Sequence, residues 1–206
     1  MSNSAEQEQL WILQARTGNQ EAFARIVQAY QRPVYNLAYR MLGSTEAAED
    51  AAQETFLRAY TRLNSYDPSY KLASWILSIA SHYCIDCLRK GKGGQVSIEQ
   101  VDGARWIPDP HLSPEDRTLN AEERRAVRRQ LDHLPDQYRL VIVLRYWHDM
   151  SYDEIAEITE STESAVKSRL HRARQMMAEL LDEQAAEPVG ASADRRLSES
   201  GMPSRV

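Results

Sequence analysis

Apolar residues recur at spacings of three and four along most of the chain, and no segment alternates apolar and polar positions as a strand would. The pattern therefore predicts helices throughout, bounded by glycines, prolines and capping residues. The expected helices span about residues 10–17, 19–42, 46–63, 72–90, 114–132, 135–147, 152–159 and 163–184. Pro33 lies inside the second of them and is expected to kink or break it near Gln31.

Composition divides these helices into two groups. Residues 93–117 are rich in glycine, proline and acidic residues and carry few apolar side chains, which is typical of a linker. We expect an all-α protein with two small helical domains, 1–92 and 118–184, joined by this acidic flexible linker. Residues 185–206 are small and polar and are expected to form a disordered tail.

A helix-turn-helix is predicted near the end of the second domain. Ser151 and Glu154 have the spacing of a capping box, which opens a short helix. Ala156 and Val166 are ten residues apart, so a small residue of this helix can lie beneath an apolar residue of the next. Glu160 stands near the turn, where a left-handed residue other than glycine costs about 1 kcal/mol.

The second helix of this motif is basic on its outer face. The exposed positions are Lys167, Ser168, His171, Arg172 and Arg174. A helix with a basic, hydroxyl-bearing face suits docking into the major groove of DNA. The alternative is an ordinary surface helix with a solvated basic face.

Net charge alone argues against nucleic-acid binding, because the chain carries a formal charge of −5. The charge is unevenly distributed, however. Residues 95–123 hold seven acidic and two basic side chains, whereas residues 163–178 hold four basic residues and one acidic residue. No segment has the run of about 20 apolar residues that spans a membrane, and no signal segment opens the chain. We expect a cytoplasmic protein with no membrane insertion.

Two cysteines, Cys84 and Cys87, form a C-x-x-C pair with His82 nearby. Thioredoxin-like motifs lie next to a strand, whereas this pair lies in an apolar helix. A zinc site would need two further ligands, which the pattern does not supply. Buried structural thiols are therefore favoured, a redox or metal switch stays open, and no cofactor is expected.

Two sets of motifs resemble the extracytoplasmic-function sigma factors of the sigma-70 family. The segments LPDQY, MSYDEIA and VKSRLHRAR, between residues 134 and 174, resemble region four. Residues 48–60 (AEDAAQETFLRAY) resemble the polymerase-binding helix of region two, and residues 75–90 resemble its promoter-melting helix. The likeness extends over about residues 6–182, in the family's order.

This resemblance implies a sigma factor, not an enzyme, that binds core RNA polymerase and promoter DNA, melting the minus-ten element and reading the minus-thirty-five element. An anti-sigma factor is a typical partner in the family. The implied polymerase-binding residues are Asp50, Gln53, Glu54 and Leu57. The implied minus-ten residues are Tyr66, Tyr70, Trp75, His82, Arg89 and Lys90, with core packing as the alternative for Trp75. The implied minus-thirty-five residues are Lys167, Ser168, His171 and Arg172, with Arg169 and Arg145 on phosphates.

Two other classes of protein remain as alternatives. A helix-turn-helix regulator would bind its operator without polymerase, but the first domain shows no phosphoacceptor-like α/β pattern. An enzyme is the weakest alternative, because no nucleophile–base pair and no glycine-rich phosphate loop is present.

Overall fold

The computed structural model describes residues 2–93 and 121–186, and every regular element in these ranges is helical. The first range holds α1 (Ser2–Arg16), α2 (Gln20–Leu42), α3 (Thr45–Arg62), the 3₁₀ turn η1 (Leu63–Ser65) and α4 (Leu72–Gly93). The second holds α6 (Ala121–His133), α7 (Asp136–Trp147), α8 (Tyr152–Ile158) and α9 (Glu163–Ala186). The all-α class is confirmed. The predicted linker and tail lie outside the described residues, apart from the residues at their edges.

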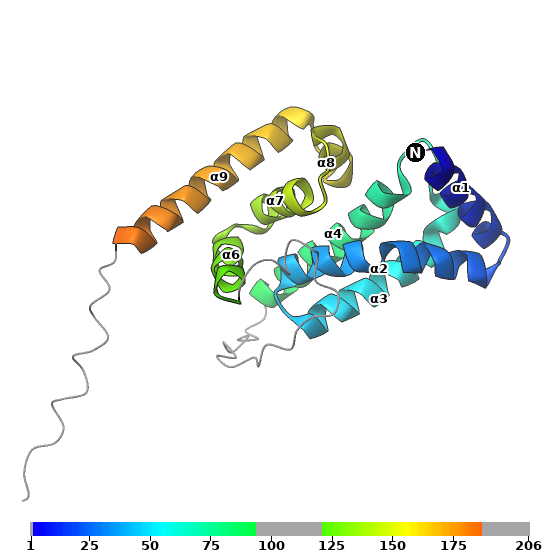
Figure 1. Cartoon of the computed structure of the whole chain (residues 1–206), viewed down its shortest axis with the longest axis horizontal. Helices are drawn as coiled ribbons and strands as arrows, with labels where there is room; N and C mark the ends of the chain where they lie inside the picture. Colours follow the sequence, from blue (N-terminus) through cyan, green and yellow to red (C-terminus); the bar gives the residue numbers. More distant parts are fainter. Residues whose placement is uncertain (1, 94–120, 187–206) are drawn as a thin grey trace, which may run out of the picture.

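Helices α1–α4 form an N-terminal bundle in which α2 contacts the other three (Figure 1). Asn19 caps the start of α2 by accepting a hydrogen bond from the Ala22 amide at 3.1 Å. Gly43 ends α2 with a left-handed φ of 79°, and Ser44 then caps α3. These boundaries follow from the capping residues in the sequence.

Of the two outcomes expected near Gln31, a kink or a break, the break is wrong, because α2 continues through Pro33. Buried residues lie on both sides of the proline, among them Tyr30, Val34 and Leu37. Packing along the whole helix therefore outweighs the roughly 3 kcal/mol that an internal proline costs.

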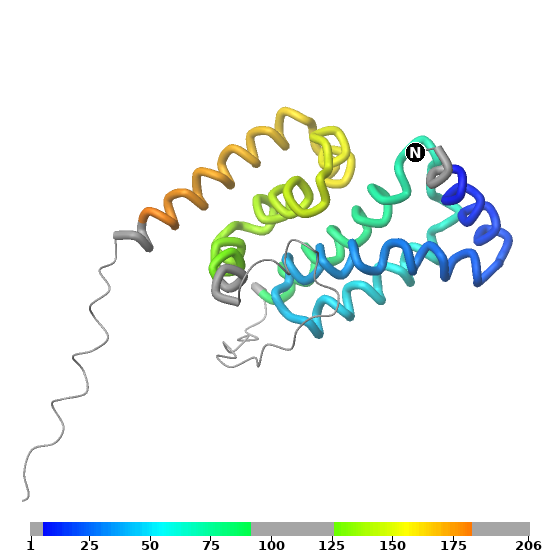
Figure 2. Tube along the Cα trace, viewed as in Figure 1, coloured from blue at the N-terminus to red at the C-terminus, as the bar shows by residue number. Residues whose placement is uncertain are grey.

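Helices α6–α9 form a C-terminal bundle, in which α7 contacts α8 and α9. Its core includes Val141, Leu144, Ile155, Val166 and Leu170, all at most 3% exposed. The trace in Figure 2 shows α9 extending well away from the other helices of this bundle.

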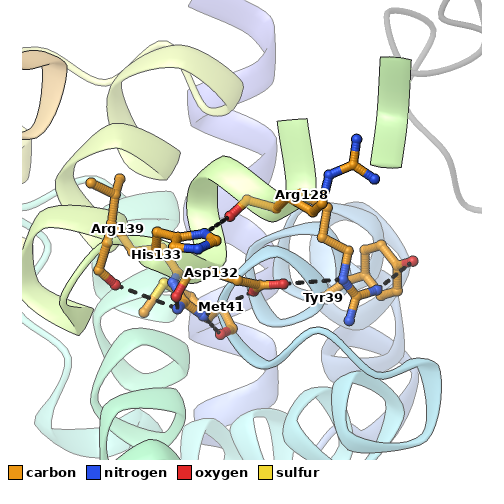
Figure 3. Close-up of polar contacts among 8 residues, drawn as sticks. Tyr39, Met41, Arg128, Asp132, His133 and Arg139 are labelled. Atoms are coloured by element: carbon orange, nitrogen blue, oxygen red, sulfur yellow. Dashed lines mark hydrogen bonds and ion pairs between the residues drawn. The ribbon is translucent and has the colours of Figure 1, made fainter. Parts of the chain in front are cut away.

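The two bundles are in contact, because α7 lies against α2 and α8 lies against α4. Arg139 of α7 is 7% exposed and donates from Nη1 to the Met41 carbonyl at 2.7 Å and from Nη2 to the Asp132 carbonyl at 3.0 Å (Figure 3). Arg128 of α6 lies over the Tyr39 ring, 5.5 Å from its centroid. The buried apolar residues accordingly form one connected cluster through both bundles.

His148 lies beside this contact at the end of α7, and its Nε2 atom is buried without a hydrogen-bond partner in the described structure. Burial, and next the neighbouring Arg40 cation, lower the pKa of His148 from 6.5 to about 4. The imidazole is therefore neutral at neutral pH.

We predict that His148 makes the protein less stable in mild acid. Its pKa is lower in the folded chain, so its contribution to stability is present above pH 6.5 and is lost as the pH falls toward about 4. His148→Phe should flatten this part of the profile when urea unfolding is measured from pH 7 to pH 4. Equal pH dependence in both chains would contradict the assignment.

Candidate nucleic-acid interface

Helix α8 begins with the predicted capping box. The Ser151 hydroxyl accepts from the Glu154 amide at 3.2 Å, and the Glu154 carboxylate accepts from the Ser151 amide at 2.7 Å. Both orphan donors are thereby satisfied, while Ile155 and Ile158 are buried against the core. The start of the helix-turn-helix is therefore fixed by residues within one turn of each other.

The turn between α8 and α9 contains the left-handed residue expected there. Glu160 has a φ of 48°, and the Ser161 amide donates to the Ala156 carbonyl at 2.9 Å. The Thr162 hydroxyl then caps α9 by accepting from the Ala165 amide at 3.2 Å, a contact that the sequence analysis missed. Threonine followed by Glu163 was the signal that could have revealed it.

The outer face of α9 bears the predicted basic residues, because Val166, Leu170 and Ala173 turn its opposite face into the core. The exposed residues are Lys167, Ser168, His171, Arg172 and Arg174. Hydrogen bonding to Glu163 at 2.7 Å raises the pKa of Lys167. Lys167 is therefore a firmly charged cation near the start of the exposed face.

Arg169 and Arg145, both expected on phosphates, are partly buried. Arg145 donates to the Met150 carbonyl at 2.7 Å and lies over the Tyr152 ring at 5.3 Å. It thus connects the end of α7 to the start of α8, a structural role that the resemblance alone did not suggest.

The implied minus-ten aromatics differ sharply in exposure. Tyr66 is only 5% exposed, its hydroxyl donates to the Tyr70 carbonyl at 2.6 Å, and its ring lies 5.1 Å from that of Trp75. Arg16 donates to the backbone carbonyls of Leu63 and Tyr66. Tyr66 is therefore a core residue, Trp75 is half-buried beside it, and Tyr70 is 49% exposed.

The polar residues of α4 lie on its surface. Arg89 and Lys90 are exposed near its end, and His82 lies midway along it. The His82 side chain is about half exposed, with Nε2 at 3.8 Å from Oε1 of Glu160.

The implied polymerase-binding face of α3 is open to solvent. Asp50 and Gln53 are exposed, and Leu57 is 60% exposed. Glu54 is half-buried and accepts from Arg58 Nε at 2.7 Å. Tyr60, one turn beyond Leu57, is 43% exposed and adds an apolar ring that the sequence analysis did not include.

The C-x-x-C pair lies at different depths in the bundle. Cys84 is fully buried, and burial raises the pKa of its thiol, so the reactive thiolate is disfavoured. Cys87 is partly buried. Within residues 2–93 and 121–186, no group of three or more histidine, cysteine or carboxylate residues could hold a metal ion. None of the described helices is long and apolar enough to cross a bilayer.

Two family profiles match the chain, Sigma-70 region 2 over residues 26–93 and Sigma-70, region 4 over residues 124–177. The ECF RNA polymerase sigma factor SigW of Bacillus subtilis is 38% identical over 172 residues, which cover 81% of this chain and 92% of that protein. SigM of the same organism is 33% identical over 152 residues, which cover 74% of this chain and 90% of that protein. The chain belongs to the ECF sigma factors.

Solved structures agree with this assignment. CnrH, in complex with the cytosolic domain of CnrY, is 26% identical to this sigma factor, with a TM-score of 0.62 and coverage of 86% of this chain and 98% of that one. RpoE of Bartonella quintana, in complex with the anti-sigma factor NepR, has the same TM-score at 23% identity, covers 78% of this chain and 96% of that one, and shows the shared fold. The family resemblance noted in the sequence is confirmed.

We predict that Ser151→Ala lowers the free energy of unfolding of this sigma factor by about 1 kcal/mol, because the Glu154 amide loses its partner. Ser151→Thr is the matched control, since threonine keeps a hydroxyl at the N-cap and should change stability little. Urea unfolding of both variants checks this. Equal losses in the two variants would mean that the hydroxyl is not the stabilising group.

Proposed function

We propose that this ECF sigma factor binds core RNA polymerase through α3 and directs initiation at promoters, with α4 acting at the minus-ten element and α9 reading the minus-thirty-five element. The observation that carries the proposal is the exposed basic face of α9 in a capped helix-turn-helix, within a chain of this family. The division into domains at 1–92 and 118–184 is part of the proposal.

Reading of the minus-thirty-five element rests on four exposed side chains of α9. Arg172 is suited to a bidentate contact with guanine, because its guanidinium matches the two acceptors on that base. Lys167 contacts a phosphate or a base edge, and Ser168 and His171 complete the groove-facing set. Arg169 and Arg145 keep a secondary phosphate role, limited by their partial burial.

Strand opening rests on Tyr70 as the exposed stacking ring, because base–aromatic stacking contributes about 1–3 kcal/mol per base. Trp75 and the buried Tyr66 support the position of Tyr70. Arg89 and Lys90 attract the phosphates at the end of α4.

Polymerase binding rests on the open face of α3. Asp50, Gln53 and Glu54 offer polar contacts, and Leu57 offers an apolar anchor among them. Apolar anchors surrounded by polar residues contribute most of the binding energy at many protein interfaces.

The partners are core RNA polymerase, promoter DNA and an anti-sigma factor, and the protein works in the cytoplasm without a catalytic centre of its own. CnrH was solved with the cytosolic domain of CnrY, and RpoE was solved with the anti-sigma factor NepR, which supports an anti-sigma partner here as well.

Run-off transcription on a promoter library with core polymerase tests the proposal. Transcripts from a defined subset of promoters, present only when both the chain and core are added, are expected. A mobility shift without core at the same promoters, together with no transcription, would instead favour an operator-binding regulator.

We predict that Arg172→Ala weakens transcription that depends on the minus-thirty-five element and leaves core binding unchanged. The expected loss in base discrimination is about 1–3 kcal/mol. The reason is its exposed place on the groove-facing side of α9. Run-off assays on promoters with and without the element measure the effect. Arg129→Ala, at an exposed position of α6, is the charge-matched control. An equal loss of core affinity in the Arg172 variant would contradict the assignment.

We predict that Asp50→Lys with Glu54→Lys weakens core binding without unfolding the bundle. The two carboxylates lie one turn apart, and the reversal replaces them with cations beside Arg58. Competition for core polymerase measures the loss. The same reversal at the exposed Glu46 and Glu49 of α3 is the control and should bind nearly normally. Undiminished binding by the first variant would show that this face is merely solvated.

A further inference from the structure

Helix α8 lies against α4. Two acidic residues, one in α8 and one just after it, lie close to basic residues of the proposed minus-ten surface. Glu154 at the start of α8 accepts from Lys71 Nζ at 2.7 Å. Glu160, just beyond the end of α8, places Oε1 at 3.8 Å from His82 Nε2. One carboxylate of the C-terminal bundle thus pairs with the Lys71 cation of the N-terminal bundle, and a second lies close to the His82 imidazole.

These two contacts are spread along α4. Lys71 directly precedes the helix and follows the exposed Tyr70, whereas His82 lies about 16 Å further along at 1.5 Å per residue. Both ends of α8 therefore touch the face that the proposed function gives to promoter DNA. Lys71 was not among the residues that the sequence singled out.

The position of Glu154 is fixed independently of Lys71. One carboxylate oxygen, Oε2, closes the capping box with the Ser151 amide, and the other, Oε1, faces Lys71. The carboxylate is therefore held in place before the bundles meet. Hydrogen bonding to Lys71 lowers the pKa of Glu154, so the group is an anion across the physiological range.

We propose that Glu154 and Glu160 act as an internal substitute for DNA phosphates, pairing with Lys71 and facing His82 in the free sigma factor until promoter DNA replaces them. This inference rests on the proposed role of α4 at the minus-ten element. Carboxylates and phosphates offer the same chemistry to a lysine, an anionic oxygen acceptor.

The contact between α8 and α4 and the binding of both promoter elements cannot occur at the same time. The two promoter elements are centred about 25 base pairs apart, which is about 85 Å of B-form DNA. In the present structure α8 of the helix-turn-helix lies on α4 itself, so the two reading surfaces cannot lie on both elements at once. Reading both elements requires α8 to leave α4, and that departure separates Lys71 and His82 from Glu154 and Glu160.

The strength of the contacts suits replacement by DNA. The Lys71 side chain is 75% exposed, and ion pairs at such exposed positions add little stability. DNA phosphates, which are denser in charge, can therefore compete for Lys71, and the competition weakens as salt rises.

The test compares the DNA affinity of full-length variants in the absence of polymerase. The probe is a fluorescein-labelled single-stranded DNA of 20 nucleotides and mixed sequence, followed by anisotropy at low salt. Glu154→Gln with Glu160→Gln should bind the probe at least about fivefold more tightly than the parent chain, as loss of one to two weak ion pairs allows. Glu154→Gln keeps the capping box, and thermal melting verifies the fold.

Two further variants make the result specific. Glu179→Gln with Asp182→Asn removes the same charge from the far end of α9 and should change affinity less than about twofold. Adding Lys71→Gln to the Glu154/Glu160 variant should abolish the gain. A gain that survives Lys71→Gln, or that the α9 control equals, would overturn the proposal, as would no gain at all.

Failure here is distinguishable from failure of the proposed function. A parent chain that gives no promoter-specific transcript with core polymerase would overturn the function. An active parent chain whose Glu154/Glu160 variant binds the probe no better would overturn only the role of the two carboxylates.

Discussion

The guanidinium of Arg139 is buried where the two helical bundles meet. It joins them through a hydrogen bond to the Met41 carbonyl of α2, and a second hydrogen bond to the Asp132 carbonyl holds it within its own bundle. A buried cation is tolerated only when such acceptors surround it, so these contacts fix how α7 sits on α2. Gly43 makes the geometry possible, because its left-handed φ ends α2 directly after Met41 and Leu42. A side chain at residue 43 would also meet the Arg128 guanidinium. This junction therefore combines one buried cation with the apolar cluster that runs through both bundles.

A protein that binds two separated promoter elements needs a contact between its two bundles that can open. Promoter elements about 85 Å apart cannot both be reached while α8 lies on α4. The chain between Gly93 and Ala121 is long enough to bridge that distance, at about 3.3–3.6 Å per extended residue. Under the proposed function, the contacts between α8 and α4 must therefore open before both promoter elements are bound.

Local signals in the sequence predicted local structure well. The capping box at Ser151, the left-handed Glu160 and the exposed face of α9 all depend on residues within one or two turns. The break at Pro33 was wrong, because packing on both sides of the proline holds α2 together. The sequence did not predict the burial of Tyr66 or the Lys71–Glu154 contact, because both depend on residues far apart in the sequence, which leave no periodic pattern.

The most direct test of this account is the distance between the bundles, measured between spin labels at Asp86→Cys in α4 and Glu157→Cys in α8, exposed positions on two helices that are in contact. Cys87→Ser removes the more accessible native thiol, and Cys84 is fully buried. The account predicts one narrow, short distance in the free chain and a distance several tens of ångströms longer when the holoenzyme is bound to promoter DNA. The same distance in both states would contradict it.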